Sequence, residues 1–284
     1  MNFQKVGVVG SGIMGGGIAE VAATAGATVI LRSRTIEAAD ALLEGLEKSL
    51  TKKVVKQGLS QADAGSIRSR VSATVDIDDL ADCDLIIESV VEDLAVKKRI
   101  FGELDRVMRP DAILATNTST LSVIELATMI SHPERVCGLH FFNPATTMPL
   151  VEIVRPLSAS DETIESVTQF AIACGKEPVE VSDRAGFIVN ALLFPYLNHA
   201  IRLLDADVAT IEGIDAAMKG GCGFPMGPFA LLDLVGLDTS LAILEALNLA
   251  FDDAYFAPEP LLRQMVSDGQ LGRKSGRGFY DYGQ

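Results

Sequence analysis

The sequence predicts an α/β protein in which a Rossmann-type doubly wound sheet is followed by an all-helical C-terminal domain. A glycine-rich turn separates the first apolar strand from the first helix, and strand-like and helical patterns then alternate. From Gly186 onward the pattern is helical. Such alternation is typical of a parallel sheet with helices on both faces. We therefore expect two domains, residues 1–185 and 186–284, which suits a chain of 284 residues.

The first elements form a strand–helix–strand unit of about 30 residues. Lys5–Val9 is a short apolar run that predicts a buried strand. Gly17–Ala25 carries apolar residues at helical spacing, and Gly26 is a suitable residue to end that helix. The second strand is expected at Thr28–Leu31.

The later elements follow from the same patterns. Between Leu43 and Val54, apolar residues recur every three or four positions, which predicts a long helix with one buried face. Further strands are expected at 71–75, 84–87, 112–115, 136–142 and 150–154, with a helix at about 95–108. C-terminal helices are expected at about 209–219, 228–250 and 258–268.

Composition excludes several classes of function. The formal net charge is -14, from 24 basic and 38 acidic residues, so general binding of nucleic acid is not expected. Three histidines and four cysteines without a CxxC spacing predict no metal site. The chain shows neither a signal-peptide pattern nor an apolar run of about 18 residues, so we expect a cytoplasmic protein that does not enter a membrane.

The glycine-rich turn predicts dinucleotide binding. Gly10, Gly12 and Gly15 form a GxGxxG pattern that follows a strand and opens a helix. Gly10 permits the tight turn, Gly12 lets the backbone approach a pyrophosphate, and Gly15 lets helix and strand pack closely. The N–H groups at the helix start bind the phosphates. The alternative is a glycine-rich turn that binds no ligand.

The end of the second strand bears on the choice of cofactor. An acid at this position binds the ribose 2′-OH of NAD, but here the residues are Arg32, Ser33 and Arg34. Hydroxyl and guanidinium groups suit a 2′-phosphate, so NADP(H) is favoured and NAD(H) is possible. In the alternative, Arg34 lies on the adenine face or in solvent.

One histidine and one glutamate are candidates for acid–base chemistry. His140 lies at the end of an apolar strand, and Glu152 lies twelve residues later in the next one. If the two strands pair as antiparallel neighbours, the carboxylate can fix the imidazole tautomer and stabilise its cation. A lone histidine in a core strand is more often structural, so the spacing alone favours that alternative.

The sequence resembles the short-chain L-3-hydroxyacyl-CoA dehydrogenases over nearly its whole length. The segments HFFNP and GRKSGRGFY are specific to that family. The segments that carry the resemblance are VGVVGSGIMGGGIA, DLIIESVVEDLAVKKRIF, ATNTSTLSV, GLHFFNPATTMPLVEIV, GFIVNALL, FPMGPFALLDLVGLDT and LGRKSGRGFYDY.

The resemblance implies roles for individual residues of the reaction site. The family's catalytic histidine matches His140, and its paired glutamate matches Glu152. The residues that position the substrate match Ser119 and Asn190, so the site is expected between the two domains. Without the resemblance, the favoured interpretation is that Ser119 is the N-cap of a helix at 122–130 and that Asn190 caps a helix or packs.

The resemblance also implies ligand contacts. The nicotinamide-side contacts match Glu92, Lys97 and Asn117. The basic residues that meet the CoA phosphates match Lys52 and Lys56, which are otherwise explained as a solvated helix face.

The implied activity is reversible hydride transfer between NADP(H) or NAD(H) and a short-chain (S)-3-hydroxyacyl-CoA, with a four-carbon acyl chain expected. The family also implies a homodimer formed through the C-terminal domain. One alternative is a β-hydroxyacid-type dehydrogenase, which has a lysine four residues before the interdomain asparagine, whereas Gly186 stands there. The other is a non-catalytic dinucleotide sensor, which would have no use for the four reaction-site residues.

Overall fold

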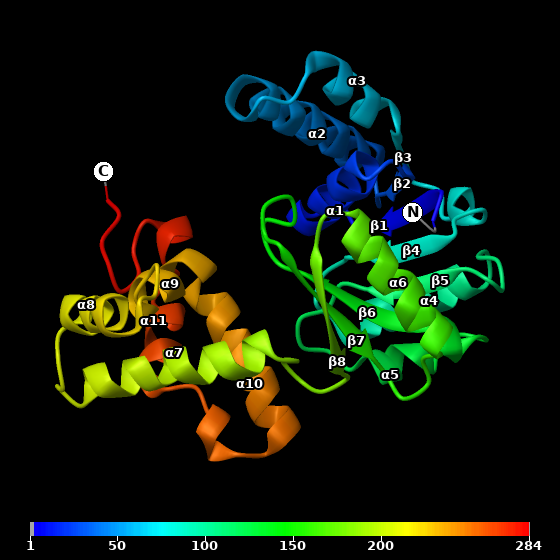
Figure 1. Cartoon of the computed structure of the whole chain (residues 1–284). Helices are drawn as coiled ribbons and strands as arrows, with labels where there is room; N and C mark the ends of the chain where they lie inside the picture. The colour runs from blue at the N-terminus through cyan, green and yellow to red at the C-terminus, as the bar shows by residue number, and fades with distance from the viewer. Residues whose placement is uncertain (1–2, 284) are drawn as a thin grey trace. The chain divides into compact units, whose positions relative to one another are not determined.

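The computed structural model describes residues 3–283 and divides into two compact units after Asp183 (Figure 1). The first unit contains an eight-stranded sheet with helices around it, and the second unit is helical. The fold class expected from the sequence is thus confirmed.

The strands of the first unit lie in the order β3-β2-β1-β4-β5-β6-β7-β8 (Figure 1). Neighbouring strands are parallel except for the antiparallel pair β6–β7. The strands are β1 Lys5–Val9, β2 Thr28–Arg32, β3 Val71–Thr74, β4 Leu85–Glu88, β5 Ile113–Thr116, β6 Val136–Phe141, β7 Leu150–Arg155 and β8 Glu177–Ser182.

The eighth strand is absent from the sequence-based expectation. Strand β8 lies at the edge of the sheet, where Val181 is its buried residue and most of the others are exposed. A strand with one buried side chain gives a weak apolar pattern, and Pro178 lowers its strand propensity further.

Helices cover both faces of the sheet. Side chains of α1, α2, α3 and α6 share one apolar cluster with Leu85 and Ile87 of β4, whereas the intervening Ile86 is buried outside that cluster. The buried side chains of α4 and α5 also lie outside it, as two-sided coverage requires. The helices are α1 Ile13–Thr24, α2 Ile36–Gln57, α3 Gln61–Ser69, α4 Leu94–Asp105, α5 Val123–Ala127 and α6 Asp161–Ala173, with 3-10 turns at 78–80 and 133–135.

The second unit has its own apolar core, built from all five of its α-helices. The single helix expected at 228–250 is wrong, because Gly236 has a φ of 102° and separates two helices. The helices are α7 Val189–Asp205, α8 Ile211–Cys222, α9 Pro228–Val235, α10 Leu237–Phe251 and α11 Pro260–Ser267, with 3-10 turns at 254–256 and 273–275.

Two buried carboxylates hold the C-terminal segment of this unit. Asp233 accepts hydrogen bonds from the backbone N–H groups of Phe279 and Tyr280, both at 2.9 Å. The Tyr280 hydroxyl donates to Asp215 at 2.9 Å. Burial, with this bond to a carboxylate, raises the pKa of Tyr280.

Within residues 3–283, no helix combines the length and the apolar character needed to cross a membrane. In the same part of the chain, no cluster of three or more His, Cys, Asp or Glu side chains is arranged to hold a metal ion.

Helix α5 begins with a cap that comes from a distant part of the chain. Ser122 occupies the N-cap position, but the Asp183 carboxylate accepts from the N–H groups of Val123 at 3.0 Å and Ile124 at 2.7 Å. The helix therefore starts after the loop that carries Ser119, and Ser119 is not its N-cap.

We expect Asp183→Ala to lower the free energy of unfolding by about 1–3 kcal/mol, because two backbone N–H groups lose their acceptor. Ser122→Ala is the control: its hydroxyl donates to Asp183 over 3.4 Å, so its loss should cost less than about 0.5 kcal/mol. Denaturant unfolding measures both. Equal losses in the two variants would contradict the assignment of Asp183 as the cap.

Candidate active site

The glycine-rich turn joins β1 to α1 in a conformation that leaves the helix start open. Gly10 has a φ of 132°, and a Cβ there would lie 2.2 Å from the Ser89 carbonyl oxygen. A Cβ on Gly15 would lie 2.1 Å from the Gly10 oxygen. A Cβ on Gly12, in contrast, would meet no described atom within 4 Å. The backbone is therefore tightly packed at Gly10 and Gly15, whereas the space beside Gly12 is open. This arrangement fits a dinucleotide pyrophosphate bound at the helix N-terminus.

The residues that follow β2 differ in exposure. The Ser33 side chain is 1% exposed, and among residues 3–283 its hydroxyl has no hydrogen-bond partner. Arg34 is exposed. Of the two side chains, Arg34 is thus the one that a ligand can approach directly.

The antiparallel pair β6–β7 brings His140 and Glu152 together. The two residues lie directly opposite each other in the register. The His140 Nδ1 and Glu152 Oε2 atoms are 2.7 Å apart, and both residues are buried, with 4% and 1% of their surfaces exposed. A carboxylate accepts from Nδ1–H at this distance, and in the neutral tautomer that such a bond selects, the lone pair lies on Nε2.

Ser119 approaches the other side of this imidazole. It lies in the loop after β5, at the carboxyl end of the parallel strands, where its Oγ is 3.1 Å from His140 Nε2. With the tautomer set by Glu152, the Ser119 hydroxyl donates to Nε2. Ser119, His140 and Glu152 therefore form one chain of hydrogen bonds.

Asn117 connects three strand ends at the same edge of the sheet. Its Nδ2 donates to Ser89 Oγ at 3.1 Å, and its Oδ1 accepts from the Phe141 N–H at 2.9 Å. Ser89 follows β4, Asn117 follows β5, and Phe141 ends β6. The side chain thus fixes the start of the Ser119 loop against the strand of His140.

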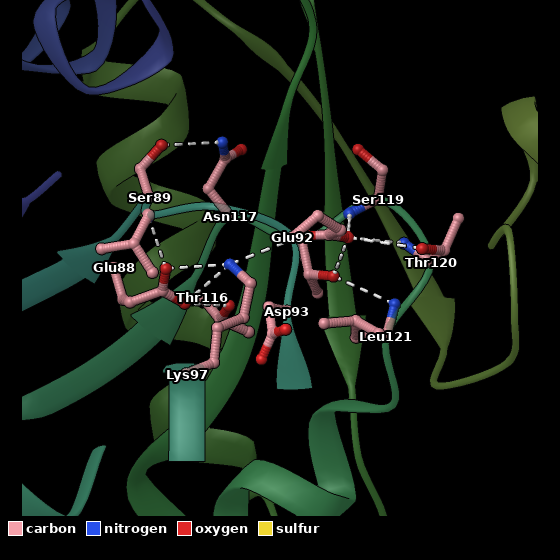
Figure 2. A network of polar contacts seen from close by, with 12 residues as sticks. Glu88, Ser89, Glu92, Asp93, Lys97, Thr116, Asn117, Ser119, Thr120 and Leu121 are labelled. Carbon is pink, nitrogen blue, oxygen red and sulfur yellow. Dashed lines mark hydrogen bonds and ion pairs between the residues drawn. The ribbon is translucent and has the colours of Figure 1, made fainter. Parts of the chain in front are cut away.

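Glu92 and Lys97 belong to a network of charged groups (Figure 2). Lys97 Nζ lies 2.8 Å from Glu88 Oε1 and 3.4 Å from Glu92 Oε2. The Lys97 side chain is fully buried, whereas that of Glu92 is 37% exposed. Glu92 is therefore the member of this network that a ligand can reach.

The other predicted residues lie away from this cluster. Lys52 and Lys56 are exposed on α2, one turn apart, and the neighbouring Lys53 pairs with the buried Glu20 at 2.7 Å. Asn190 is the second residue of α7 in the second unit and is 6% exposed.

Sequence reasoning missed three residues that support the site. Glu88 and Thr116 end neighbouring strands, and the Thr116 hydroxyl donates to Glu88 Oε2 at 2.7 Å. Lys176 Nζ donates to the carbonyl oxygens of Ala145 and Met148 at 2.6 and 2.8 Å, and so holds the loop between β6 and β7. A glutamate that ends the apolar run of β4 was the available signal for Glu88.

Two family models match nearly the whole chain. The model described as 3-hydroxyacyl-CoA dehydrogenase, NAD binding domain, matches residues 5–184. The model described as 3-hydroxyacyl-CoA dehydrogenase, C-terminal domain, matches residues 186–282.

Full-length relatives give the same result. A protein of Mycobacterium tuberculosis named 3-hydroxybutyryl-CoA dehydrogenase is 47% identical over 286 residues, with 99% of each chain covered. One of the same name from Clostridioides difficile is 46% identical over 279 residues, covering 98% of this chain and 99% of the relative.

Solved structures agree with the sequence relatives. FadB2 of M. tuberculosis superposes with a TM-score of 0.96 at 46% identity, and 99% of each chain is covered. The (S)-3-hydroxybutyryl-CoA dehydrogenase PaaH1 of Ralstonia eutropha gives a TM-score of 0.97 at 39% identity, covering 99% of this chain and 100% of that one. The resemblance inferred from the motifs is confirmed, and the chain belongs to the 3-hydroxyacyl-CoA dehydrogenase family.

Proposed function

We propose that this enzyme interconverts acetoacetyl-CoA and (S)-3-hydroxybutyryl-CoA, with a nicotinamide dinucleotide as its redox partner. The observation that carries the proposal is the hydrogen-bonded chain Ser119–His140–Glu152 at the carboxyl edge of the sheet, where the glycine-rich turn also lies. The names of the M. tuberculosis relative and of PaaH1 support the four-carbon substrate.

His140 acts as the acid and base. When the hydroxyl is oxidised, Nε2 accepts its proton, because the lone pair of the neutral ring lies on that nitrogen. In the opposite direction the imidazolium returns a proton to the oxygen. Glu152 holds the ring in this orientation and stabilises the cation from 2.7 Å.

The substrate oxygen needs hydrogen-bond donors while charge develops on it. Ser119 is suited to this role because its hydroxyl already faces His140 Nε2. The resemblance assigns the second donor to Asn190. Gly10, Gly12 and Gly15 would hold the cofactor pyrophosphate, with Glu92 and Asn117 toward the nicotinamide, and the bound cofactor supplies or accepts the hydride.

An absorbance assay at 340 nm with acetoacetyl-CoA and each reduced cofactor tests the proposal. Rapid, CoA-dependent oxidation of the cofactor is expected. Turnover of a free 3-hydroxy acid without CoA would favour a β-hydroxyacid-type dehydrogenase. Tight cofactor binding without any turnover would favour a dinucleotide sensor.

We expect His140→Gln to lower kcat by about 10²–10⁴-fold, the range for a positioned acid–base group. Glu152→Gln should lower kcat as well and move the pH–rate profile to lower pH, because the imidazolium loses its anionic partner. Dinucleotide binding, measured by fluorescence titration, should persist in both variants. Near-normal turnover in either one would remove that residue from the mechanism.

For the CoA portion of the substrate, we propose contacts from Lys52 and Lys56. Replacing both with Ala should raise KM for acetoacetyl-CoA and weaken its salt dependence, with little change in kcat, because the contact is remote from the reacting carbon. Lys48→Ala is a control on the same helix, since Lys48 is 79% exposed and pairs with Glu44. An equal rise in KM for a truncated thioester would place the lysines elsewhere.

For the cofactor, we propose a preference for NADPH over NADH. Residues 32–34 contain no acid to accept the ribose 2′-OH, and the exposed Arg34 can make a forked contact with a 2′-phosphate. Such a contact is worth roughly 1.5–3 kcal/mol, or about 10- to 150-fold in kcat/KM.

Steady-state kinetics with both cofactors test this preference. Replacing the exposed Arg34 by Ile should abolish it, because the guanidinium is the group at this strand end that can reach a 2′-phosphate. A wild-type enzyme that prefers NADH tenfold would show that the end of β2 does not decide the cofactor.

The family resemblance also supports a homodimer and a cytoplasmic location. Sedimentation velocity on the purified chain measures the first, and a monomer at micromolar concentration would contradict it.

A further inference from the structure

The network around Lys97 joins the buried end of β4 to the more exposed Glu92. Glu88 is 0% exposed, and both of its carboxylate oxygens bind Lys97 Nζ, at 2.8 and 3.0 Å. Oε1 also accepts from the Val90 N–H at 2.6 Å, and Oε2 accepts from the Thr116 hydroxyl at 2.7 Å. These four bonds hold Glu88 and therefore fix where Lys97 Nζ lies.

A contribution to the stability of the fold does not explain why an ion pair is buried this deeply. Removing two charges from water costs several kcal/mol, and well-packed apolar residues in their place are often as stable or more stable. Because Glu88 and Lys97 are both 0% exposed, solvent does not reduce that cost. A role in orienting other groups is therefore the more informative explanation. Glu92, the next residue in the network, is such a group.

Glu92 connects Lys97 to the loop of Ser119 through its two carboxylate oxygens. Its Oε2 lies 3.4 Å from Lys97 Nζ, while its Oε1 accepts from the Thr118 hydroxyl at 2.5 Å and from the Ser119 N–H at 2.8 Å. The Thr120 N–H donates to the same oxygen at 3.2 Å. Figure 2 shows Glu92 between Lys97 and this loop. One carboxylate thus ties the buried cation to three consecutive residues, 118–120.

The loop in turn presents Ser119 Oγ to His140 Nε2 at 3.1 Å. We propose that Glu88 and Thr116 are positioning residues that set the Ser119 hydroxyl against His140 through Lys97 and Glu92. Neither residue contacts the reacting atoms in this role. The inference rests on the proposed function, because it requires Ser119 to act on the substrate oxygen.

Thr116 offers a test that leaves the buried charges in place. Thr116→Val removes the hydroxyl that binds Glu88, and we expect kcat for acetoacetyl-CoA to fall about 3- to 10-fold with KM changed less than about twofold. Thr116→Ser keeps the hydroxyl and should restore most of kcat. Thr163→Val is the matched control: Thr163 is equally buried, and its hydroxyl donates to the Glu134 carbonyl oxygen in the same unit.

Thr163→Val should lose stability without losing kcat. If Thr116→Val retains wild-type kcat, or if Thr116→Ser is as slow as Thr116→Val, the proposal is overturned.

A double-mutant cycle tests whether Glu88 acts through Ser119. Glu88→Gln should lower kcat about 10- to 100-fold in the wild-type enzyme, because Lys97 loses its buried partner and the loop shifts. In a Ser119→Ala enzyme the same change should lower kcat less than about twofold, since the hydroxyl that it positions is already gone. Fully additive losses would show that Glu88 acts by another route.

An NMR measurement reports the geometry without any turnover. The chain has three histidines, His132, His140 and His199, and the His140 ring signal is the one that is missing from His140→Gln. Thr116→Val and Ser119→Ala should both shift this signal while the other two stay unchanged. An unshifted His140 signal in Thr116→Val would overturn the positioning role. A wild type without turnover would instead refute the proposed function and leave this result valid.

Discussion

The antiparallel pairing of β6 with β7 sets Glu152 opposite His140, and the proposed acid–base pair depends on that register. Residues that face each other in a pair point to the same side of the sheet, so a shift of one residue would turn Glu152 to the other face. The loop between the two strands must therefore have a fixed length and shape. Lys176 holds it through two carbonyl oxygens, and burial lowers the pKa of that ammonium group. Lys176 directly precedes β8, and its ammonium group thus holds the loop that joins β6 to β7.

Much of the first unit could be predicted from local patterns. The strands at its centre are fully buried and give continuous apolar runs, and Gly10 and Gly15 stand where a side chain would collide with the backbone. The apolar sequence patterns do not predict a strand that is only partly buried. Strand β8 buries Val181 and little else, and the long apolar pattern near the C-terminus concealed the break that the positive φ of Gly236 introduces. A single glycine in an apolar stretch does not show which backbone conformation it adopts.

The residues that support the site were harder to predict than those proposed to act in it. His140 and Glu152 lie on strands that the sequence predicts, so their pairing followed from one assumption about strand direction. Lys97 lies on a helix with a polar face, where a lysine is ordinarily solvated, and only the packed structure shows that it is fully buried. The cap of α5 comes from Asp183, 60 residues beyond Val123, and no local spacing could reveal that partner.

Charge explains how an acidic protein can still bind anionic ligands. The net charge of -14 raises the cost of bringing a dinucleotide or a CoA phosphate to the surface. The structure neutralises acids beside the expected ligand sites: Lys53 pairs with the buried Glu20 of α1, and Lys97 pairs with Glu88 at the end of β4. With these carboxylates matched, the positive potential of the open start of α1 is opposed less strongly. At physiological salt, charges more than about 8 Å apart are largely screened at the surface, so local pairing governs phosphate binding more than the total charge does.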